Sequence, residues 1–330
     1  MPTVYFHTLD DTDVLSLQLN DNESLLDGIL RSGIDVPFGC KSGVCQSCLM
    51  QSNDTIPQTA QLGLRQTQIE QGFFMSCCCL PEDGFRAHMT KPKSDFVTAK
   101  VLEKELLNQD IYRIRVEKVV DYRPGQFATL WSSNGVARSY SFASHPQEDD
   151  FIEFHIKKIE NGAFSQWAWN NLEQSHTLEI QGPLGDCFYT ESDMNQTLLM
   201  CGIGTGLAPL YGILRDALIS GHKGKITLYL GGRNSTNLYF MDNLKTLAEK
   251  FNNFSFECFV QEVVLDNQSA NIQQGDIYQE VKRAYPNLED TKVFLCGADS
   301  FVKKMKKQCF LSGASMKDIS SDAFIAFKKD

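Results

Sequence analysis

Three cysteines within one nine-residue stretch most constrain what this chain can fold into. Cys40, Cys45 and Cys48 follow a C-x4-C-x2-C spacing, and Cys77 comes later in the chain. Thiolates are soft anionic ligands that bind iron and zinc. A structural zinc site usually shows two C-x2-C pairs, whereas three crowded cysteines and one distant cysteine are typical of a 2Fe–2S cluster. We therefore expect a tight loop that a later segment reaches with the fourth thiol.

The fourth ligand is ambiguous because Cys77, Cys78 and Cys79 are consecutive. The run that begins at Gly72 resembles the G-aromatic-x-L-x-C segment of plant-type ferredoxins, in which a proline stands four places after the ligand. Pro81 fills that place if Cys77 is the ligand. The resemblance therefore selects Cys77 and leaves Cys78 and Cys79 as packing residues, with Cys78 as the alternative ligand.

The first part of the chain, residues 1–92, predicts a β-grasp ferredoxin domain. Alternating residues predict strands at 3–9 and 14–19, and Asn22 can cap a helix whose apolar stripe ends before Gly33. The cysteine loop follows directly. These 92 residues contain eleven Asp and Glu against five Lys and Arg, a net charge of −6. Such a domain either steers onto a basic partner or is simply kept in solution by its charge.

Residues 95–190 predict an antiparallel β-barrel, after a linker at 91–94. Strand-like runs at 110–120, 126–131, 139–143, 151–158 and 176–181 alternate with turns. From residue 191 to 330 the pattern changes, with strands at 197–201, 225–230, 255–261 and 292–296 and helices at 208–220 and 243–251. Alternating strands and helices predict a Rossmann-like parallel α/β domain. The expected fold class is therefore multidomain, α+β and α/β.

A flavin motif lies in the predicted barrel, where Arg138, Ser139, Tyr140 and Ser141 are consecutive. The run resembles the Arg-x-Tyr-Ser motif of the ferredoxin–NADP⁺ reductase superfamily. The resemblance implies that Arg138 grips the pyrophosphate of FAD, that Tyr140 stacks on the flavin ring, and that Ser141 hydrogen-bonds its N5 edge. It also implies a second phosphate contact in a G-x-x-S loop, which begins at Gly162 and ends at Ser165.

A glycine-rich turn between a predicted strand and helix indicates a dinucleotide site. The turn resembles the G-x-G-T-G-x-A-P run of the same superfamily, and its residues are Gly202, Gly204, Thr205, Gly206 and Pro209.

Further on, Cys296 and Gly297 resemble the family's C-G-P segment, with Ala298 in place of the proline. The implied role of Cys296 is to line the place where nicotinamide meets flavin, although a buried core cysteine is the alternative. Arg233 follows the next strand and could bind a 2′-phosphate. NADH users of the superfamily also carry such an arginine, so NADH is preferred over NADPH on family grounds alone. Phe324 stands where the family has an aromatic residue near the flavin.

Taken together, the chain resembles the iron–sulfur flavoprotein reductase components of bacterial multicomponent oxygenases. The resemblance implies an electron-transfer oxidoreductase that takes hydride from NAD(P)H onto FAD, with Tyr140, Ser141 and Cys296 at the reacting centre. Single electrons would then pass through the cluster to an oxygenase, a hydroxylase or a ferredoxin. The alternatives are the reductase of a dehydrase in deoxysugar synthesis, an NAD(P)H–flavin reductase with a structural cluster, and an NAD(P)H-sensing or scaffold protein in which the cluster is only structural.

Composition limits the partners and the compartment. The net charge of −10 disfavours nucleic acid and anionic membranes, and no apolar run reaches the ~18 residues of a membrane span. The first residues lack the basic start and apolar core of a secretory signal. Eleven cysteines then favour metal ligation and burial over disulfides. We therefore expect a cytoplasmic protein.

Overall fold

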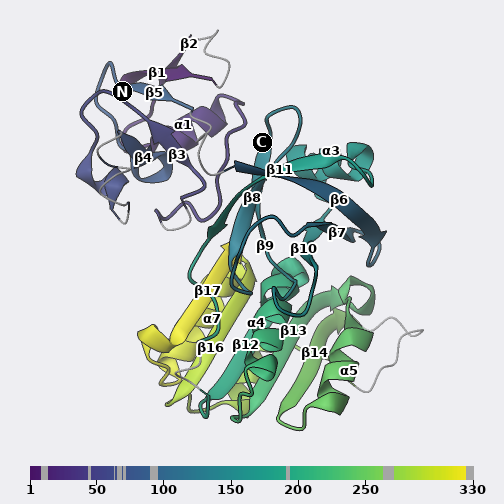
Figure 1. Cartoon of the computed structure of the whole chain (residues 1–330). Helices are drawn as coiled ribbons and strands as arrows, with labels where there is room; N and C mark the ends of the chain where they lie inside the picture. The colour runs from purple at the N-terminus through teal and green to yellow at the C-terminus, as the bar shows by residue number, and fades with distance from the viewer. Residues whose placement is uncertain are drawn as a thin grey trace.

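The computed structural model describes residues 1–8, 14–43, 46–62, 64, 69, 72–89, 96–190, 194–262 and 271–324. Within these residues the chain forms three sheets, one in each third of the molecule (Figure 1). Their topologies confirm the expected fold class of a β-grasp unit, an antiparallel barrel and a parallel α/β unit. Cys45 and the predicted linker at 91–94 lie outside the described residues.

The first sheet has the order β2-β1-β5-β3-β4, with β1 parallel to β5 and antiparallel to β2. Its elements are β1 (Thr3–His7), β2 (Val14–Gln18), α1 (Leu25–Arg31), β3 (Leu49–Gln51), η1 (Gln58–Gln61), β4 (Phe73–Met75), η2 (Ser76–Cys78) and β5 (Arg86–His88). The apolar stripe of α1 packs on the sheet, where Leu26, Ile29 and Phe74 are fully buried. The cap of α1 was predicted wrongly, because the Ser24 hydroxyl, not Asn22, accepts the Asp27 N–H at 3.1 Å.

The second sheet has the order β10-β7-β6-β11-β8-β9, and a bridge between Phe142 and Phe154 joins its two ends into a barrel. Its elements are β6 (Phe96–Leu106), β7 (Ile111–Glu117), β8 (Phe127–Trp131), β9 (Ala137–Ser141), β10 (Phe151–Lys157), α3 (Ala163–Asn171) and β11 (Thr177–Leu184). The sequence did not predict α3. The Lys104 ammonium holds its C-terminal end by donating to the carbonyls of Ala168, Trp169 and Leu172 at 2.9, 2.7 and 3.0 Å.

The third sheet is parallel, in the order β15-β14-β13-β12-β16-β17. Its strands are β12 (Thr197–Ile203), β13 (Ile226–Asn234), β14 (Phe254–Glu262), β15 (Ile272–Gln274), β16 (Thr291–Ala298) and β17 (Ile319–Phe324). Its helices are α4 (Leu207–Ile219), α5 (Met241–Lys250), α6 (Ile277–Ala284) and α7 (Asp299–Leu311), with short turns η4 (Gly204–Gly206), η5 (Ser235–Asn237) and η6 (Met316–Asp318). The strand order reverses between β12 and β16, and a crevice at such a point is where open α/β sheets bind ligands.

Polar contacts join the parallel unit to the barrel. Arg215 on α4 forms a two-pronged salt bridge with Asp149 of the barrel, with Nη2 and Oδ1 3.0 Å apart. His155 on β10 is hydrogen-bonded through Nδ1 to the Tyr239 hydroxyl at 3.1 Å. These contacts hold α4 and the segment after β13 against the barrel.

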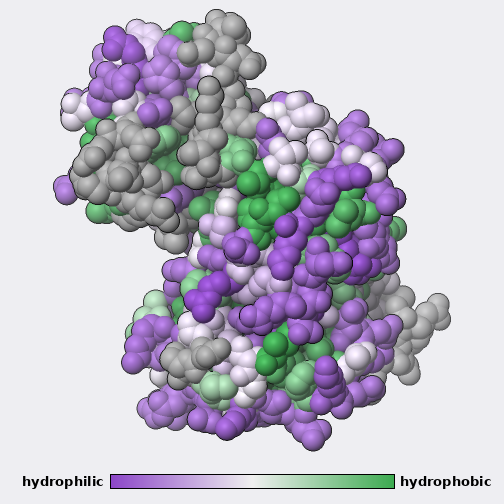
Figure 2. Space-filling model, viewed as in Figure 1, coloured by the Kyte–Doolittle hydropathy of each residue, from purple (hydrophilic) through white to green (hydrophobic). Residues whose placement is uncertain are grey.

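The outer surface is mostly hydrophilic on the face drawn in Figure 2, where the hydrophobic areas are small and separated. Among the described residues, none of the helices combines the length and apolar character that a membrane span requires.

Candidate functional site

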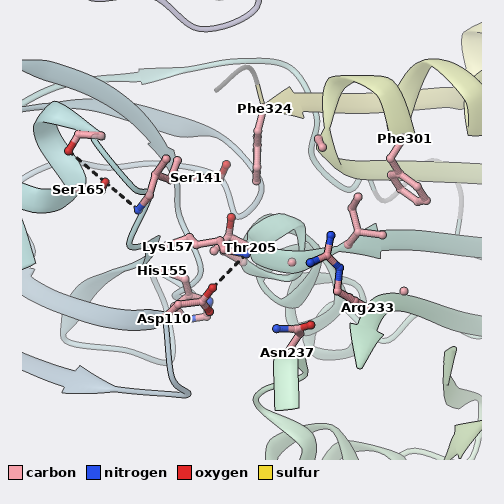
Figure 3. A pocket seen from close by; sticks show the side chains of 18 of the residues that line it. Asp110, Ser141, His155, Lys157, Ser165, Thr205, Arg233, Asn237, Phe301 and Phe324 are labelled. Carbon is pink, nitrogen blue, oxygen red and sulfur yellow. Dashed lines mark hydrogen bonds and ion pairs between the residues drawn. The ribbon is translucent and has the colours of Figure 1, made fainter. Parts of the chain in front are cut away.

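A cavity of about 1470 Å³ lies between the barrel and the parallel sheet, and residues of the first domain also line it. Nine of the predicted site residues are in its wall: Arg138, Ser139, Tyr140, Ser141, Gly162, Ser165, Gly204, Thr205 and Arg233. Figure 3 shows Ser141 and Ser165 on the barrel side, and Thr205 and Arg233 on the side of the parallel sheet. Residues from motifs far apart in sequence therefore meet around one space.

The strand β9 supplies the barrel side of the cavity. Arg138 and Tyr140 share one face of the strand because side chains alternate along it. The Tyr140 ring lies 5.3 Å from the ring of Phe164, which holds it in a tilted contact. Burial raises the pKa of Tyr140, so its hydroxyl stays protonated at physiological pH. This arrangement offers an aromatic face and a guanidinium to the same ligand.

The G-x-x-S motif forms the N-terminus of α3. The Ser165 hydroxyl accepts the Ile159 N–H at 3.1 Å, which folds the loop back onto its helix. A Cβ on Gly162 would lie 2.5 Å from that hydroxyl, so the loop requires glycine there. Gly162 caps the helix without a side-chain hydrogen bond. The N–H groups of the first turn have no partner within the helix and suit a phosphate.

Asp322 on β17 is a site residue that sequence reasoning missed. The Ser141 hydroxyl donates to its Oδ2 at 2.8 Å, across 181 positions of sequence. Burial raises the pKa of this carboxyl to about 6, although the Ser141 hydrogen bond opposes the rise. Phe324, two residues later, lines the cavity, and Figure 3 shows it between Ser141 and Phe301. Phe324 was the sequence signal that pointed to this strand, but nothing in the sequence paired the Asp322 carboxyl with Ser141.

The glycine-rich turn joins β12 to α4 and supplies the opposite side of the cavity. A Cβ on Gly206 would lie 2.1 Å from the carbonyl oxygen of Cys296, and a Cβ on Gly202 would lie 2.7 Å from Leu210. These two glycines therefore serve close backbone packing. Gly204 has a left-handed φ of +55° with open space around its Cβ position. Pro209 stands in the first turn of α4, whose N-terminus has no side-chain cap.

The end of β16 forms the floor beneath this turn. Cys296 is fully buried and is not among the described residues that line the cavity, although Ala298 lines it. Burial, together with the neighbouring thiol of Cys187, raises the pKa of Cys296. Gly297 has a φ of +136°, and a Cβ there would lie 2.9 Å from Ile203. A role for Cys296 beside nicotinamide stays a prediction.

Four cysteines of the first domain gather at one loop: Cys40, Cys48, Cys77 and Cys78. The Cys77 thiol lies beside Cys48 and the backbone of Gly43, and the Ser42 N–H donates to Cys40 Sγ at 3.4 Å. Backbone N–H groups directed at sulfur are the usual environment of a cluster. Among the described residues no three ligand side chains already stand at metal-binding spacing, and Cys45 lies outside them.

The three consecutive cysteines, Cys77, Cys78 and Cys79, lie in different environments. Cys79 is fully buried in the core of the first domain, as expected for a packing residue. Cys78 is not a packing residue of that kind, because its Sγ lies 3.7 Å from Cys77 Sγ and next to Gly43. Both Cys77 and Cys78 therefore face the loop, and the choice of Cys77 stays a prediction.

The cysteine loop packs against the flavin strand. The hydroxyls of Ser47 and Ser139 are hydrogen-bonded at 2.7 Å, and Arg138 Nη2 donates to Asp35 Oδ1 at 2.7 Å. The first domain therefore contacts β9, the strand that supplies the flavin motif. Figure 1 shows this domain next to the barrel.

Three family models match consecutive parts of the chain. The 2Fe-2S iron-sulfur cluster binding domain matches residues 10–82, the oxidoreductase FAD-binding domain matches 98–189, and the oxidoreductase NAD-binding domain matches 199–307. The side chains described above fit these groups: thiols with backbone donors for iron and sulfide, an arginine and an uncapped helix for phosphates, and a glycine turn for a dinucleotide.

Relatives match this chain over nearly its whole length. The reductase component of the naphthalene 1,2-dioxygenase/salicylate 5-hydroxylase systems of Ralstonia is 29% identical, over 94% of this chain and 96% of its own. The phenol hydroxylase P5 protein of Acinetobacter pittii is 24% identical, over 94% and 92%. The solved cytochrome P450 reductase of Amycolatopsis has the same fold, with a TM-score of 0.67 and 24% identity over 98% of this chain and 99% of its own.

Motifs, geometry and comparisons agree on the three parts and on their order along the chain. The protein is an oxidoreductase that joins an iron–sulfur domain, an FAD-binding domain and an NAD-binding domain, and it is similar over nearly its whole length to the reductase components of oxygenase systems.

Proposed function

We propose that the protein takes hydride from NAD(P)H, with NADH preferred, and delivers single electrons to an oxygenase or hydroxylase component or to a separate ferredoxin. One observation carries the proposal: residues of all three domains line a single cavity. A flavin placed there is within reach of both the nucleotide turn and the domain that bears the cysteine loop.

The residues of the cavity have separate tasks. Arg138 and the N-terminus of α3 would hold the diphosphate of FAD, and Tyr140 would bound its ring. Bound there, FAD would supply the exchange between a two-electron hydride donor and a one-electron iron–sulfur carrier. The turn around Gly204 would hold the pyrophosphate of the coenzyme. The Asp322 carboxylate accepts from the Ser141 hydroxyl and so orients that hydroxyl in the cavity wall.

The nature of the acceptor follows from the relatives. The Ralstonia relative is described as acting with a ferredoxin, whereas the relative from Acinetobacter pittii belongs to a phenol hydroxylase. Both kinds of acceptor take single electrons. The net charge of −6 on residues 1–92 suits an acceptor with a basic docking face.

We also propose the division of the chain into domains at 1–92, 95–190 and 191–330, with Cys40, Cys45, Cys48 and Cys77 as the cluster ligands. A cytoplasmic location is supported by the thiols, since all ten described cysteines are free.

The test is an anaerobic titration of the purified protein with NADH, followed by visible absorption and low-temperature EPR. We expect the flavin and cluster bands to bleach together and the EPR signal of a reduced 2Fe–2S cluster to appear. Flavin bleaching without cluster reduction would contradict the proposal and favour a simple flavin reductase. A parallel titration with NADPH tests the coenzyme preference.

Two cysteine variants sharpen this test. Cys40→Ser should remove the EPR signal while NADH still bleaches the flavin. Cys258→Ser changes a thiol buried in β14, far from the loop, and should leave both signals intact. Equal loss in the two variants would indicate general instability and not cluster ligation.

A further inference from the structure

We propose that Asp35 of the iron–sulfur domain is a positioning residue of the FAD site, where it orients Arg138 toward the diphosphate of FAD. The inference deepens the proposed function and rests on its placement of FAD in the large cavity. The matched FAD-binding family covers residues 98–189, so this contribution comes from outside the part of the chain assigned to the flavin.

Three contacts hold the Arg138 guanidinium in place. Nη2 donates to Asp35 Oδ1 at 2.7 Å, and Nη1 donates to the Ala137 carbonyl at 2.7 Å. The guanidinium carbon also lies 5.3 Å from the centroid of the Phe38 ring. Two of these anchors, Asp35 and Phe38, belong to the iron–sulfur domain. The orientation of Arg138 is therefore set largely by a domain other than its own.

The guanidinium keeps donors for a ligand. An arginine has five N–H donors in a rigid fork, and two of those on Arg138 are used by the acceptors named above. The other three have no partner among the residues that the structure describes. Arg138 lines the cavity, so an anion in the cavity can accept from this remaining edge of the fork.

Asp35 lies in the cavity wall as well. It lines the cavity together with Gly33 and Ile34, directly after α1. Its second oxygen, Oδ2, is buried and has no hydrogen-bond partner among the described residues. A buried carboxylate oxygen without a donor is costly. The charged hydrogen bond that the other oxygen accepts from Arg138 offsets part of that cost.

The position of Asp35 links the two cofactor sites. Cys40 follows it by five residues, and Ser47, in the same loop, is hydrogen-bonded to Ser139 beside Arg138. The contact that orients the arginine therefore also seats the cysteine loop on the flavin strand. FAD binding and the seating of the iron–sulfur domain should stabilise each other.

The expected effect is a loss of FAD affinity in Asp35→Asn. Immobilising a long side chain on binding costs roughly two- to tenfold in affinity. Asp35 already holds the Arg138 side chain before FAD binds, so the unaltered protein avoids this loss. We expect FAD to bind roughly tenfold more weakly to the variant. If instead Asp35 competes with FAD for Arg138, the variant will bind FAD more tightly, and that result overturns the proposal.

The experiment removes flavin from the full-length protein and titrates it with FAD, following the quenching of flavin fluorescence. Asp27→Asn is the matched control, because Asp27 pairs with Lys41 in the same domain but does not line the cavity. The control should bind FAD as the unaltered protein does. Equal weakening in both variants overturns the specific role of Asp35.

A riboflavin titration separates positioning from general damage. Riboflavin lacks phosphate, so Asp35→Asn should change riboflavin affinity less than twofold if Asp35 acts through Arg138. In an Arg138→Gln background, Asp35→Asn should have no further effect on FAD affinity. Additive losses, or equal losses for the two flavins, overturn the proposal.

Two further outcomes keep the test decisive. If Asp35→Asn loses its cluster, the same titration is run on Arg138→Lys. A lysine cannot donate to Asp35 and to the Ala137 carbonyl at once in the way the guanidinium does. Unchanged FAD affinity in Arg138→Lys overturns the proposal. If the unaltered protein itself fails to bind FAD, the proposed function fails. If it binds FAD and Asp35→Asn binds equally well, only this inference fails.

Discussion

Two glycines of the nucleotide turn should respond differently to the same substitution. Gly204→Ala should weaken binding of the coenzyme with little loss of stability, whereas Gly206→Ala should damage the fold. The two positions are two residues apart, so the contrast depends on their surroundings and not on their place in the motif.

The magnitude at Gly206 follows from a direct clash. A new methyl carbon would lie 2.1, 2.5 and 2.8 Å from the Cys296 carbonyl oxygen, the Cys296 carbonyl carbon and the Gly297 nitrogen. All three are backbone atoms in or beside β16, which pairs with β12 directly beneath the turn. Relief requires α4 or β16 to move. Overpacking of this kind costs about 3 kcal/mol.

The magnitude at Gly204 follows from backbone strain alone. Its φ of +55° lies in the left-handed region, where alanine costs about 1 kcal/mol more than glycine. No heavy atom stands within 4 Å of the new methyl carbon. The residue lines the cavity, so the methyl group would occupy space where the backbone should approach a pyrophosphate. We expect NAD⁺ affinity to fall at least about tenfold.

Thermal unfolding by circular dichroism measures the first effect, because four of the described helices, α4 to α7, belong to the parallel unit. Isothermal titration with NAD⁺ measures the second. Gly84→Ala is the control for strain, since Gly84 has a φ of +84° and open space but lies in the iron–sulfur domain. The reasoning is refuted if Gly204→Ala binds NAD⁺ normally, or if Gly206→Ala unfolds no earlier than Gly84→Ala.

Three further predictions concern single residues. Cys77→Ser should abolish the visible spectrum of the cluster and Cys78→Ser should preserve it; the reverse result would assign the ligand to Cys78. Lys104→Met should destabilise the barrel by about 2 kcal/mol, because the three carbonyls that end α3 lose a charged donor; denaturant unfolding followed by tryptophan fluorescence measures the loss, since all three tryptophans lie in the barrel. Arg233→Gln should leave kcat/KM for NADH within about threefold and lower it for NADPH about tenfold, whereas equal losses with both coenzymes would exclude a contact to the 2′-phosphate.

Local pattern predicted the local structure well wherever one periodicity dominated. The continuous apolar run of β12 and the alternating residues of β1 gave the correct strand type. The helix α3 was missed because its N-terminal residues were interpreted as a phosphate loop, and both interpretations fit the same glycine and serine. The cap was predicted at Asn22, whereas Ser24 fills that position; both residue types cap helices, and only the backbone geometry distinguishes them.

By itself the sequence determined the order of the three domains and the chemistry of their motifs, since cysteine spacing and glycine turns are local and few residue types can replace them. Tertiary structure alone decided which distant residues complete the cavity. Asp322 reaches Ser141 across 181 positions, and Asp35 reaches Arg138 across 103. Such pairs leave no periodic trace, because a carboxylate on a strand or loop finds its partner only when separate domains pack together.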